Sequence, residues 1–172
     1  MKRLLVALAV MITMQASGQY NLDVTVDNET GDIVYRGECT FKDLSSEQAF
    51  TWLRTGVGHY NPDRASVTYL ERHLKDYNIV VLMGTWCEDS HKMLPQIYKL
   101  LRITQYPMSQ YKMYGLDLNK QGYLDEHEKY KVENVPTVIL FNKGKEVGRV
   151  VETAKVSLEA DLKDIIKKHK EG

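Results

Sequence analysis

The feature that most constrains this 172-residue chain is a continuous apolar run, Asn78 to Gly84, that leads directly into a helical pattern. Unbroken apolar runs of this length are typical of a strand buried on both faces of a sheet. From Glu88 to Arg102, apolar residues recur at helical spacing, which predicts a helix after a short connection. A buried strand followed by a helix is a unit from which α/β sheets are built.

Further strands and helices are predicted on both sides of this unit. Alternating apolar residues around the turn 28–32 predict a β-hairpin near the N-terminus. A short helix is expected to open at Ser45, to carry Ala49, Phe50 and Leu53, and to stop near Gly56–Gly58. The other expected elements are a helix from Asn61-Pro62, a strand over 111–118, a hairpin of strands 137–141 and 146–151, and a helix over 156–168. The predicted class is α/β, a central mixed β-sheet flanked by helices, with an N-terminal extension of β-hairpin and short helix.

Composition excludes several classes of protein. With 43% hydrophobic residues and no net charge, the chain can bury a core, and intrinsic disorder is not expected. The 23 basic and 23 acidic residues leave no positive excess, so neither nucleic acid nor anionic lipid is an expected partner. Two cysteines exclude a disulfide-stapled scaffold and a four-cysteine metal or iron–sulfur site.

Residues 1–18 have the features of a secretory signal peptide. A basic pair, Lys2-Arg3, precedes an apolar run, and the small residues Ala16-Ser17-Gly18 offer a cleavage site near Gly18. The run is short for a bilayer span, and the alternative is an uncleaved membrane anchor. We expect a periplasmic or secreted protein without stable membrane insertion after cleavage. In such an oxidising compartment, a free thiol must be protected, cycled or paired.

The candidate chemistry lies in Trp86-Cys87-Glu88-Asp89-Ser90, between the buried strand and its helix. The helix N-terminus favours a thiolate at Cys87, and a thiolate is the nucleophile of disulfide exchange. Glu88 and Asp89 oppose the thiolate by repulsion, although both suit a first helical turn. Ser90 can donate a hydrogen bond to the sulfur but cannot close a disulfide. The alternatives are an inert buried cysteine and a serine that only starts the helix.

The pattern strand–Trp86-Cys87-x-x-Ser90–helix resembles the thioredoxin superfamily, with the second active-site cysteine replaced by serine. Pro95, the segment Val135-Pro136-Thr137 before a strand, and a strand–turn–strand at 141–148 extend the resemblance over about 63–169. The stretch 84–90 also resembles exported thioredoxin-like proteins of the kind found in Bacteroidetes, whose extension is similar to residues 19–60. The resemblance implies a signal peptide (1–18), an N-terminal extension (19–60) and a thioredoxin-like domain (61–172).

The resemblance also implies a role for each site residue. Cys87 would be the nucleophile, with Ser90 beside it and Trp86 as a flat apolar platform. Pro136 would be cis and lie opposite Cys87, and Val135 would offer backbone groups to an extended substrate segment. The alternatives are a packed core tryptophan and a plain trans turn. Glu88, Asp89 and His91 are the candidate modulators, and no cofactor is implied.

The departures from the family pattern limit the expected activity. Val81 stands where many thioredoxins bury an aspartate, and Glu88 and Asp89 replace the usual glycine and proline. Without a second cysteine, mixed disulfides persist until an external thiol attacks, which argues against a general disulfide reductase. The expected activity is monothiol exchange, isomerase-like or thiol-capturing, with protein thiols and disulfides of the cell envelope as partners. The alternative is a redox-silent module that binds an extended peptide, and a peroxidase is a weaker third option.

Cys39 has two interpretations. It is either a small buried hydrophobe or a partner for Cys87, and we expect no Cys39–Cys87 bond in the resting protein.

Two metal patterns are also present, and neither leads us to predict a metal. Cys87 and His91 lie four residues apart on one helix face, but two ligands do not make a site. The segment Asp117–Glu128 fits much of the EF-hand spacing, with Gly122 and Glu128 at the sixth and twelfth positions. Gln121 weakens that ligand set, and the alternative is a polar loop whose glycine allows a turn.

Overall fold

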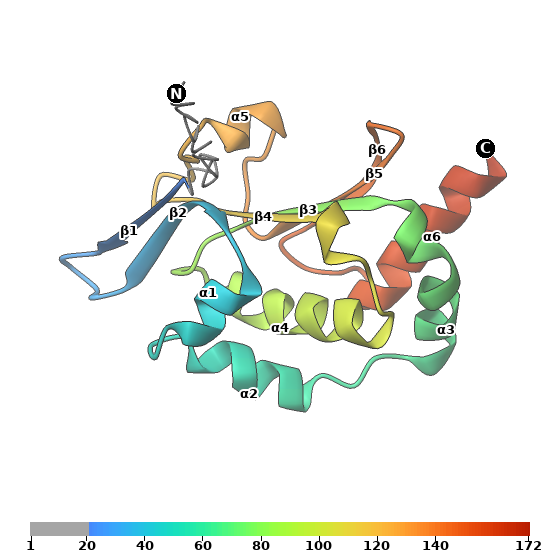
Figure 1. Cartoon of the computed structure of the whole chain (residues 1–172), viewed down its shortest axis with the longest axis horizontal. Coiled ribbons are helices and arrows are strands. Elements are labelled where there is room, and N and C mark those ends of the chain that lie inside the picture. The colour runs from blue at the N-terminus through green and yellow to red at the C-terminus, as the bar shows by residue number, and fades with distance from the viewer. Residues whose placement is uncertain (1–20) are drawn as a thin grey trace, which may run out of the picture.

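A computed structural model describes residues 21–172, so the predicted signal peptide lies outside the described residues. One six-stranded sheet runs through the molecule in the order β1-β2-β4-β3-β5-β6 (Figure 1). The strands are β1 (Leu22–Val26), β2 (Ile33–Cys39), β3 (Asn78–Met83), β4 (Tyr111–Gly115), β5 (Thr137–Asn142) and β6 (Lys145–Val151). Strands β3 and β4 are parallel and every other neighbouring pair is antiparallel, which confirms the predicted mixed sheet.

Most of the helices cover one face of this sheet (Figure 1). They are α1 (Phe41–Ser46), α2 (Thr51–His59), α3 (Arg64–His73), α4 (Glu88–Ile103) and α6 (Leu158–Glu171). The one-turn helix α5 (Glu126–Lys129) lies on the opposite side, and short 3₁₀ turns cover Leu74–Asp76 and Met108–Gln110. Helix α4 is the central helix, because it packs against the sheet and also contacts α2, α3 and α6.

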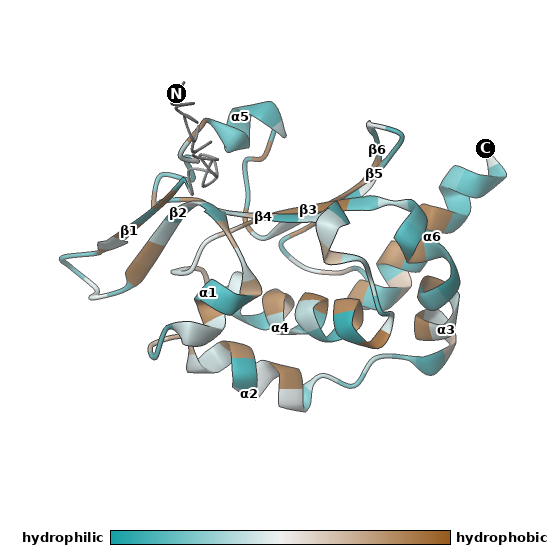
Figure 2. Ribbon diagram, viewed as in Figure 1, coloured by the Kyte–Doolittle hydropathy of each residue, from teal (hydrophilic) through white to brown (hydrophobic). Residues whose placement is uncertain are grey.

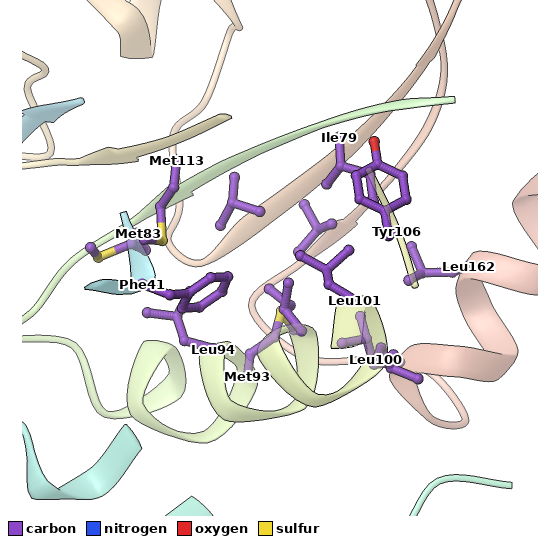
Figure 3. Close-up of a cluster of buried hydrophobic side chains, with 14 of the residues drawn as sticks. Phe41, Ile79, Met83, Met93, Leu94, Leu100, Leu101, Tyr106, Met113 and Leu162 are labelled. Atoms are coloured by element: carbon purple, nitrogen blue, oxygen red, sulfur yellow. The ribbon is translucent and has the colours of Figure 1, made fainter. Parts of the chain in front are cut away.

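The core consists of two clusters, one on each face of β3. The larger cluster lies between the sheet and α4, where Met83, Leu94 and Met113 meet (Figure 3). The smaller cluster lies on the other face and brings Leu82, Leu116 and neighbouring apolar residues against the segment that contains α5. Figure 2 shows hydrophobic residues along β3 and α4 and a hydrophilic end of α6. The buried run on β3 therefore has apolar neighbours on both faces, as its sequence predicts.

The N-terminal hairpin is part of the same sheet. Strand β2 pairs with β4 through Gly37↔Gly115 and Cys39↔Met113, and β1 forms the outer edge. Phe41 and Leu53, from the two helices that follow, are buried in the larger cluster. The segment 21–60 thus supplies both an edge of the sheet and a part of the main core.

The prediction of one short helix from Ser45 was wrong. A capping box between Thr40 and Asp43 starts α1 at Phe41, and the chain leaves helical geometry before α2 begins. Ala49 lies in the connection between the two helices, and α2 continues through Gly56 to His59. Glycine is needed at position 56, because an added Cβ would lie 2.5 Å from the Pro95 ring of α4.

Two predicted boundaries also shifted. The strand expected over 111–118 ends at Gly115, because Asp117 turns the chain by accepting hydrogen bonds from the N–H groups of Asn119 and Gln121. The helix expected from Asn61-Pro62 begins at Arg64 instead, since the Asp63 carboxylate caps it by accepting from Ser66 N–H at 2.8 Å.

Candidate functional site

Cys87 is the N-cap residue of α4. Its backbone is extended, its N–H donates to the Gly84 carbonyl at 3.1 Å, and its carbonyl accepts from His91 N–H at 3.0 Å. The half-buried sulfur therefore lies at the start of a 16-residue helix, where backbone N–H groups have no helical partner. We call residues 84–87, which join β3 to α4, the Cys87 loop.

The sulfur faces the segment that precedes β5. The Cys87 thiol donates to the Val135 carbonyl at a sulfur–oxygen distance of 3.3 Å, and the Val135–Pro136 peptide bond is cis. The Pro136 carbonyl accepts from Glu152 N–H at 2.7 Å, just beyond the end of β6. The cysteine thus contacts the segment before β5, and Glu152 in turn contacts that segment.

Trp86 holds the Cys87 loop against the sheet. Its indole Nε1–H donates to the Leu116 carbonyl at 3.0 Å, and the ring belongs to the smaller core cluster with Cys87. The indole also covers Gly84, where an added Cβ would lie 2.7 Å from a ring carbon. Trp86 is partly exposed and directly precedes Cys87, so it both packs and presents a surface.

Ser90 is fully buried, and its hydroxyl accepts from Gly84 N–H at 3.2 Å. Within residues 21–172, the hydroxyl bonds this backbone group and not the Cys87 sulfur. Ser90 therefore ties the first turn of α4 to the beginning of the Cys87 loop.

His91 is held by two contacts that the sequence does not reveal. Its Nε2 lies 2.6 Å from the Thr85 carbonyl, and since a carbonyl only accepts, Nε2 carries the proton. The imidazole stacks on Trp52 of α2, with ring centroids 4.5 Å apart and planes 16° apart. The ring therefore bridges the extension and the Cys87 loop, one helical turn after the cysteine.

Thr85 makes a second bridge to the extension. Its hydroxyl donates to the Ile33 carbonyl at 2.7 Å and accepts from Tyr35 N–H at 3.1 Å, both on β2. The side chain is buried, so these bonds are shielded from water. Sequence reasoning missed Thr85 and Trp52 because their partners lie far along the chain. The one local signal is a polar threonine directly after a buried strand.

Two acidic residues, Glu88 and Asp89, follow the cysteine in the first turn of α4. Glu88 is exposed, and Asp89 pairs with Lys92 at 3.0 Å on the outer side of α4. The hydrogen bond and the negative charge of Asp89 raise the pKa of the Lys92 ammonium. Carboxylates suit the first turn of a helix, while beside a sulfur they oppose its ionisation.

Cys39 lies away from this site in β2, where it is paired with Met113 of β4. Both cysteines are free thiols. Burial raises the pKa of the Cys39 thiol far above its ordinary value, with the nearby Asp43 charge adding to the effect. Cys39 is thus a buried core residue, and Cys87 is the accessible thiol.

The residues of the two metal patterns make other contacts. His91 Nε2 donates to a backbone carbonyl, and the Asp117 carboxylate accepts two backbone N–H groups and lies 3.6 Å from Arg36. Across residues 21–172, no three His, Cys, Asp or Glu side chains gather in a way that could hold a metal ion. Likewise, none of the helices in that range has the length and apolar character needed to cross a membrane.

Residues 67–168 match the family model of thioredoxin, and this match covers more than half of the chain. The chain belongs to the thioredoxin family. Thioredoxin-1 of Saccharomyces cerevisiae is 37% identical over 73 residues, which are 42% of this chain and 65% of the yeast protein, just under two thirds.

Two solved structures illustrate the structural similarity. An HIV epitope-scaffold has a TM-score of 0.50 at 15% identity, over 78% of this chain and 99% of the scaffold. Oxidised mitochondrial thioredoxin 3 of Saccharomyces cerevisiae has a TM-score of 0.38 at 19% identity, over 59% of this chain and 89% of that one. The family match and the topology together establish the thioredoxin-like fold with its six-stranded mixed sheet.

Proposed function

We propose that this protein is an exported member of the thioredoxin family that carries out monothiol thiol–disulfide exchange through Cys87. The observation that carries the proposal is the position of the sulfur. It is half-buried at the N-cap of α4 and lies 3.3 Å from the Val135 carbonyl, beside cis-Pro136. A cysteine in such a place can meet the sulfur of another protein while a helix N-terminus favours its thiolate.

The proposed step is a thiolate attack on a substrate disulfide. A Cys87–substrate S–S bond forms, the substrate's own S–S bond breaks, and its second sulfur leaves with the electron pair and takes up a proton. Ser90 cannot attack this mixed disulfide, so an external thiolate must do so and release Cys87. One disulfide is consumed and one is formed at each exchange, and no net oxidant is required.

The neighbouring residues support this step in distinct ways. Trp86 offers an apolar surface beside the sulfur, and the chain at Val135–Pro136 offers an edge along which an extended substrate segment can lie. Ser90 and His91 hold the Cys87 loop through Gly84 N–H and the Thr85 carbonyl. In this proposal Ser90 positions the loop and does not react.

Export is part of the proposal, and it rests on the basic, apolar and small-residue pattern of residues 1–18. Processing near Gly18 would place the reduced protein among the thiols and disulfides of the cell envelope, in the periplasm or outside the cell. Cell fractionation with N-terminal sequencing tests this part, and protein confined to the cytoplasm with an intact Met1 would contradict it.

The exchange activity is tested by trapping partners in the native compartment. Cells are quenched with acid, free thiols are blocked, and mixed disulfides of the protein are separated without reductant and identified by mass. We expect adducts linked through Cys87 that vanish in Cys87→Ala and persist in Cys39→Ser. Equal trapping by Cys87→Ala would end the proposal.

A redox-silent peptide-binding module is the second candidate. It is favoured by the contact in which the thiol donates to Val135 and by the carboxylates of Glu88 and Asp89 beside the sulfur. The rate of Cys87 alkylation against pH separates the two candidates. A thiol that reacts no faster than free cysteine at every pH supports the binding module.

A further inference from the structure

A cavity of about 330 Å³ lies beside the Cys87 site, between α4 and the segment that joins β6 to α6. We call it the α4–β6 pocket. Its walls combine three charged side chains, those of Asp89, Lys92 and Glu152, with apolar ones that include Met93 and Val156. Val156 is 79% exposed, the highest exposure among the large hydrophobic residues of 21–172, and it forms part of the rim.

Both walls of the pocket connect to the reacting sulfur. On one wall, Asp89 follows Cys87 by two residues in the first turn of α4. On the other wall, Glu152 N–H donates to the Pro136 carbonyl, and the preceding carbonyl, that of Val135, accepts from the Cys87 thiol. A substrate segment that places its sulfur on Cys87 therefore passes the mouth of this pocket within a few residues.

The charges in the pocket favour a cation. Asp89 and Glu152 contribute two carboxylates against the single ammonium of Lys92, which already pairs with Asp89 at 3.0 Å. In the described part of the chain, the Glu152 carboxylate has neither an ion pair nor a side-chain hydrogen bond. Because Asp89 and Lys92 neutralise each other, Glu152 supplies the net negative charge, and Glu88 in the first turn of α4 offsets the positive end of the helix dipole, which is equivalent to about half a charge.

We propose that the α4–β6 pocket receives a lysine or arginine side chain that lies within a few residues of the substrate's reacting cysteine. The inference rests on the proposed exchange through Cys87. The aliphatic stem of such a side chain packs on exposed Val156 at the rim, and its charged end reaches the carboxylate of Glu152. The substrate class is thus a basic segment around a cysteine, and acidic segments are disfavoured.

The test uses three peptides of equal length that carry one cysteine, activated as a neutral 2-pyridyl disulfide. The two residues before the cysteine and the two residues after it are varied. All four are lysine in the first peptide, alanine in the second and glutamate in the third. The Cys87 thiolate attacks the peptide sulfur, the bond to the pyridyl sulfur breaks with its electron pair, and the released 2-thiopyridine takes up a proton. Its absorbance gives the second-order rate constant, and Cys87→Ala gives the background.

We expect the lysine peptide to react about tenfold faster than the glutamate peptide at low salt, since several partly exposed charge pairs each contribute a few-fold. The ratio should fall at high salt, because screening weakens such pairs. In Glu152→Gln the ratio should drop to about threefold. The matched control is Glu171→Gln, the same charge change at the far end of α6, and it should keep the full ratio (Figure 1).

The outcomes separate the inference from the function on which it rests. If all three peptides react at the Cys87→Ala background rate, the exchange proposal fails. If they react above background at equal rates, or if Glu152→Gln keeps the full ratio, the exchange proposal stands and the pocket inference is overturned. Circular dichroism of each variant shows whether it is folded.

Discussion

At the scale of single residues, Thr85 is the point where the extension and the Cys87 loop meet. Its hydroxyl satisfies one carbonyl and one N–H of β2 in a buried place, at Ile33 and Tyr35. Removing a hydroxyl that serves two buried backbone groups leaves both without a partner, and each loss costs on the order of 1–3 kcal/mol. We therefore expect Thr85 to contribute more to the free energy of unfolding than its small side chain suggests.

The prediction is that Thr85→Val, which keeps the shape of the side chain, lowers the free energy of unfolding by about 3 kcal/mol. Thr85→Ser keeps the hydroxyl and loses one methyl group, so it should cost about 1 kcal/mol. Urea denaturation of the two variants and the parent checks both values. Equal losses in the two variants would mean that the hydroxyl does not hold the loop to β2.

Residues such as Thr85, whose partners lie far along the chain, could not be identified from the sequence. The Cys87 motif and Pro136 were found because their neighbours in the chain carry the pattern. Thr85 and Trp52 were missed because their partners, on β2 and at His91, are set by the fold. For Ser90 the sequence could not decide between sulfur and backbone as the partner, because both lie within reach of a side chain in the first helical turn.

At the scale of elements, Glu159 links the extension to α6. It is buried, and its carboxylate accepts from the Tyr60 hydroxyl at 2.5 Å and from Asp63 N–H at 2.9 Å. Burial by itself would raise the pKa of Glu159, but these hydrogen bonds outweigh it and leave the pKa below its ordinary value. The carboxylate therefore contributes stability that is complete above the ordinary pKa of glutamate and is lost as pH falls through the lower, folded value.

Glu159→Gln should accordingly lower the free energy of unfolding by about 2 kcal/mol at pH 7, since hydrogen bonds to a charged group are lost. At a pH below the folded pKa, the parent carboxyl is neutral too, so the difference should shrink toward zero. Denaturation of both proteins across this pH range provides the check. A difference that stays constant with pH would show that Glu159 acts through packing alone.

The longer strands and helices of residues 61–172 were predicted, because apolar periodicity identifies a buried strand and an amphipathic helix directly, whereas the one-turn helix α5 was missed. The break in the helix between Ser46 and Thr51 was not predicted, since Ala49, Phe50 and Leu53 also fit one helical face. In the local sequence Gly56 indicates a helix end, although it lies inside α2 and makes room for Pro95. A glycine required by a distant partner resembles a helix terminator when only the local sequence is read.

At the scale of the whole molecule, the extension and the thioredoxin-like part share one sheet and one main core. Strand β2 pairs with β4, and the larger apolar cluster contains Phe41 and Leu53 together with Leu94 of α4. Elements that share a core are expected to unfold together. The segment 21–60 is thus predicted to be an integral part of the folded unit.

The two tryptophans allow this prediction to be checked. In Trp86→Phe, the remaining Trp52 reports on α2 through its fluorescence, while far-ultraviolet circular dichroism reports on the whole chain. We expect the two signals to change at the same denaturant concentration. A Trp52 transition that precedes the loss of secondary structure would show that the extension unfolds separately.

Exchange through Cys87 is tested by following this cysteine after contact with a disulfide. The reduced protein is mixed with a small peptide disulfide, quenched with acid and measured by intact mass and peptide mapping. We expect one half-peptide on Cys87, none on buried Cys39, and an adduct that persists until an external thiol is added. Failure to form the adduct, or its conversion into a Cys39–Cys87 disulfide without added thiol, would contradict it.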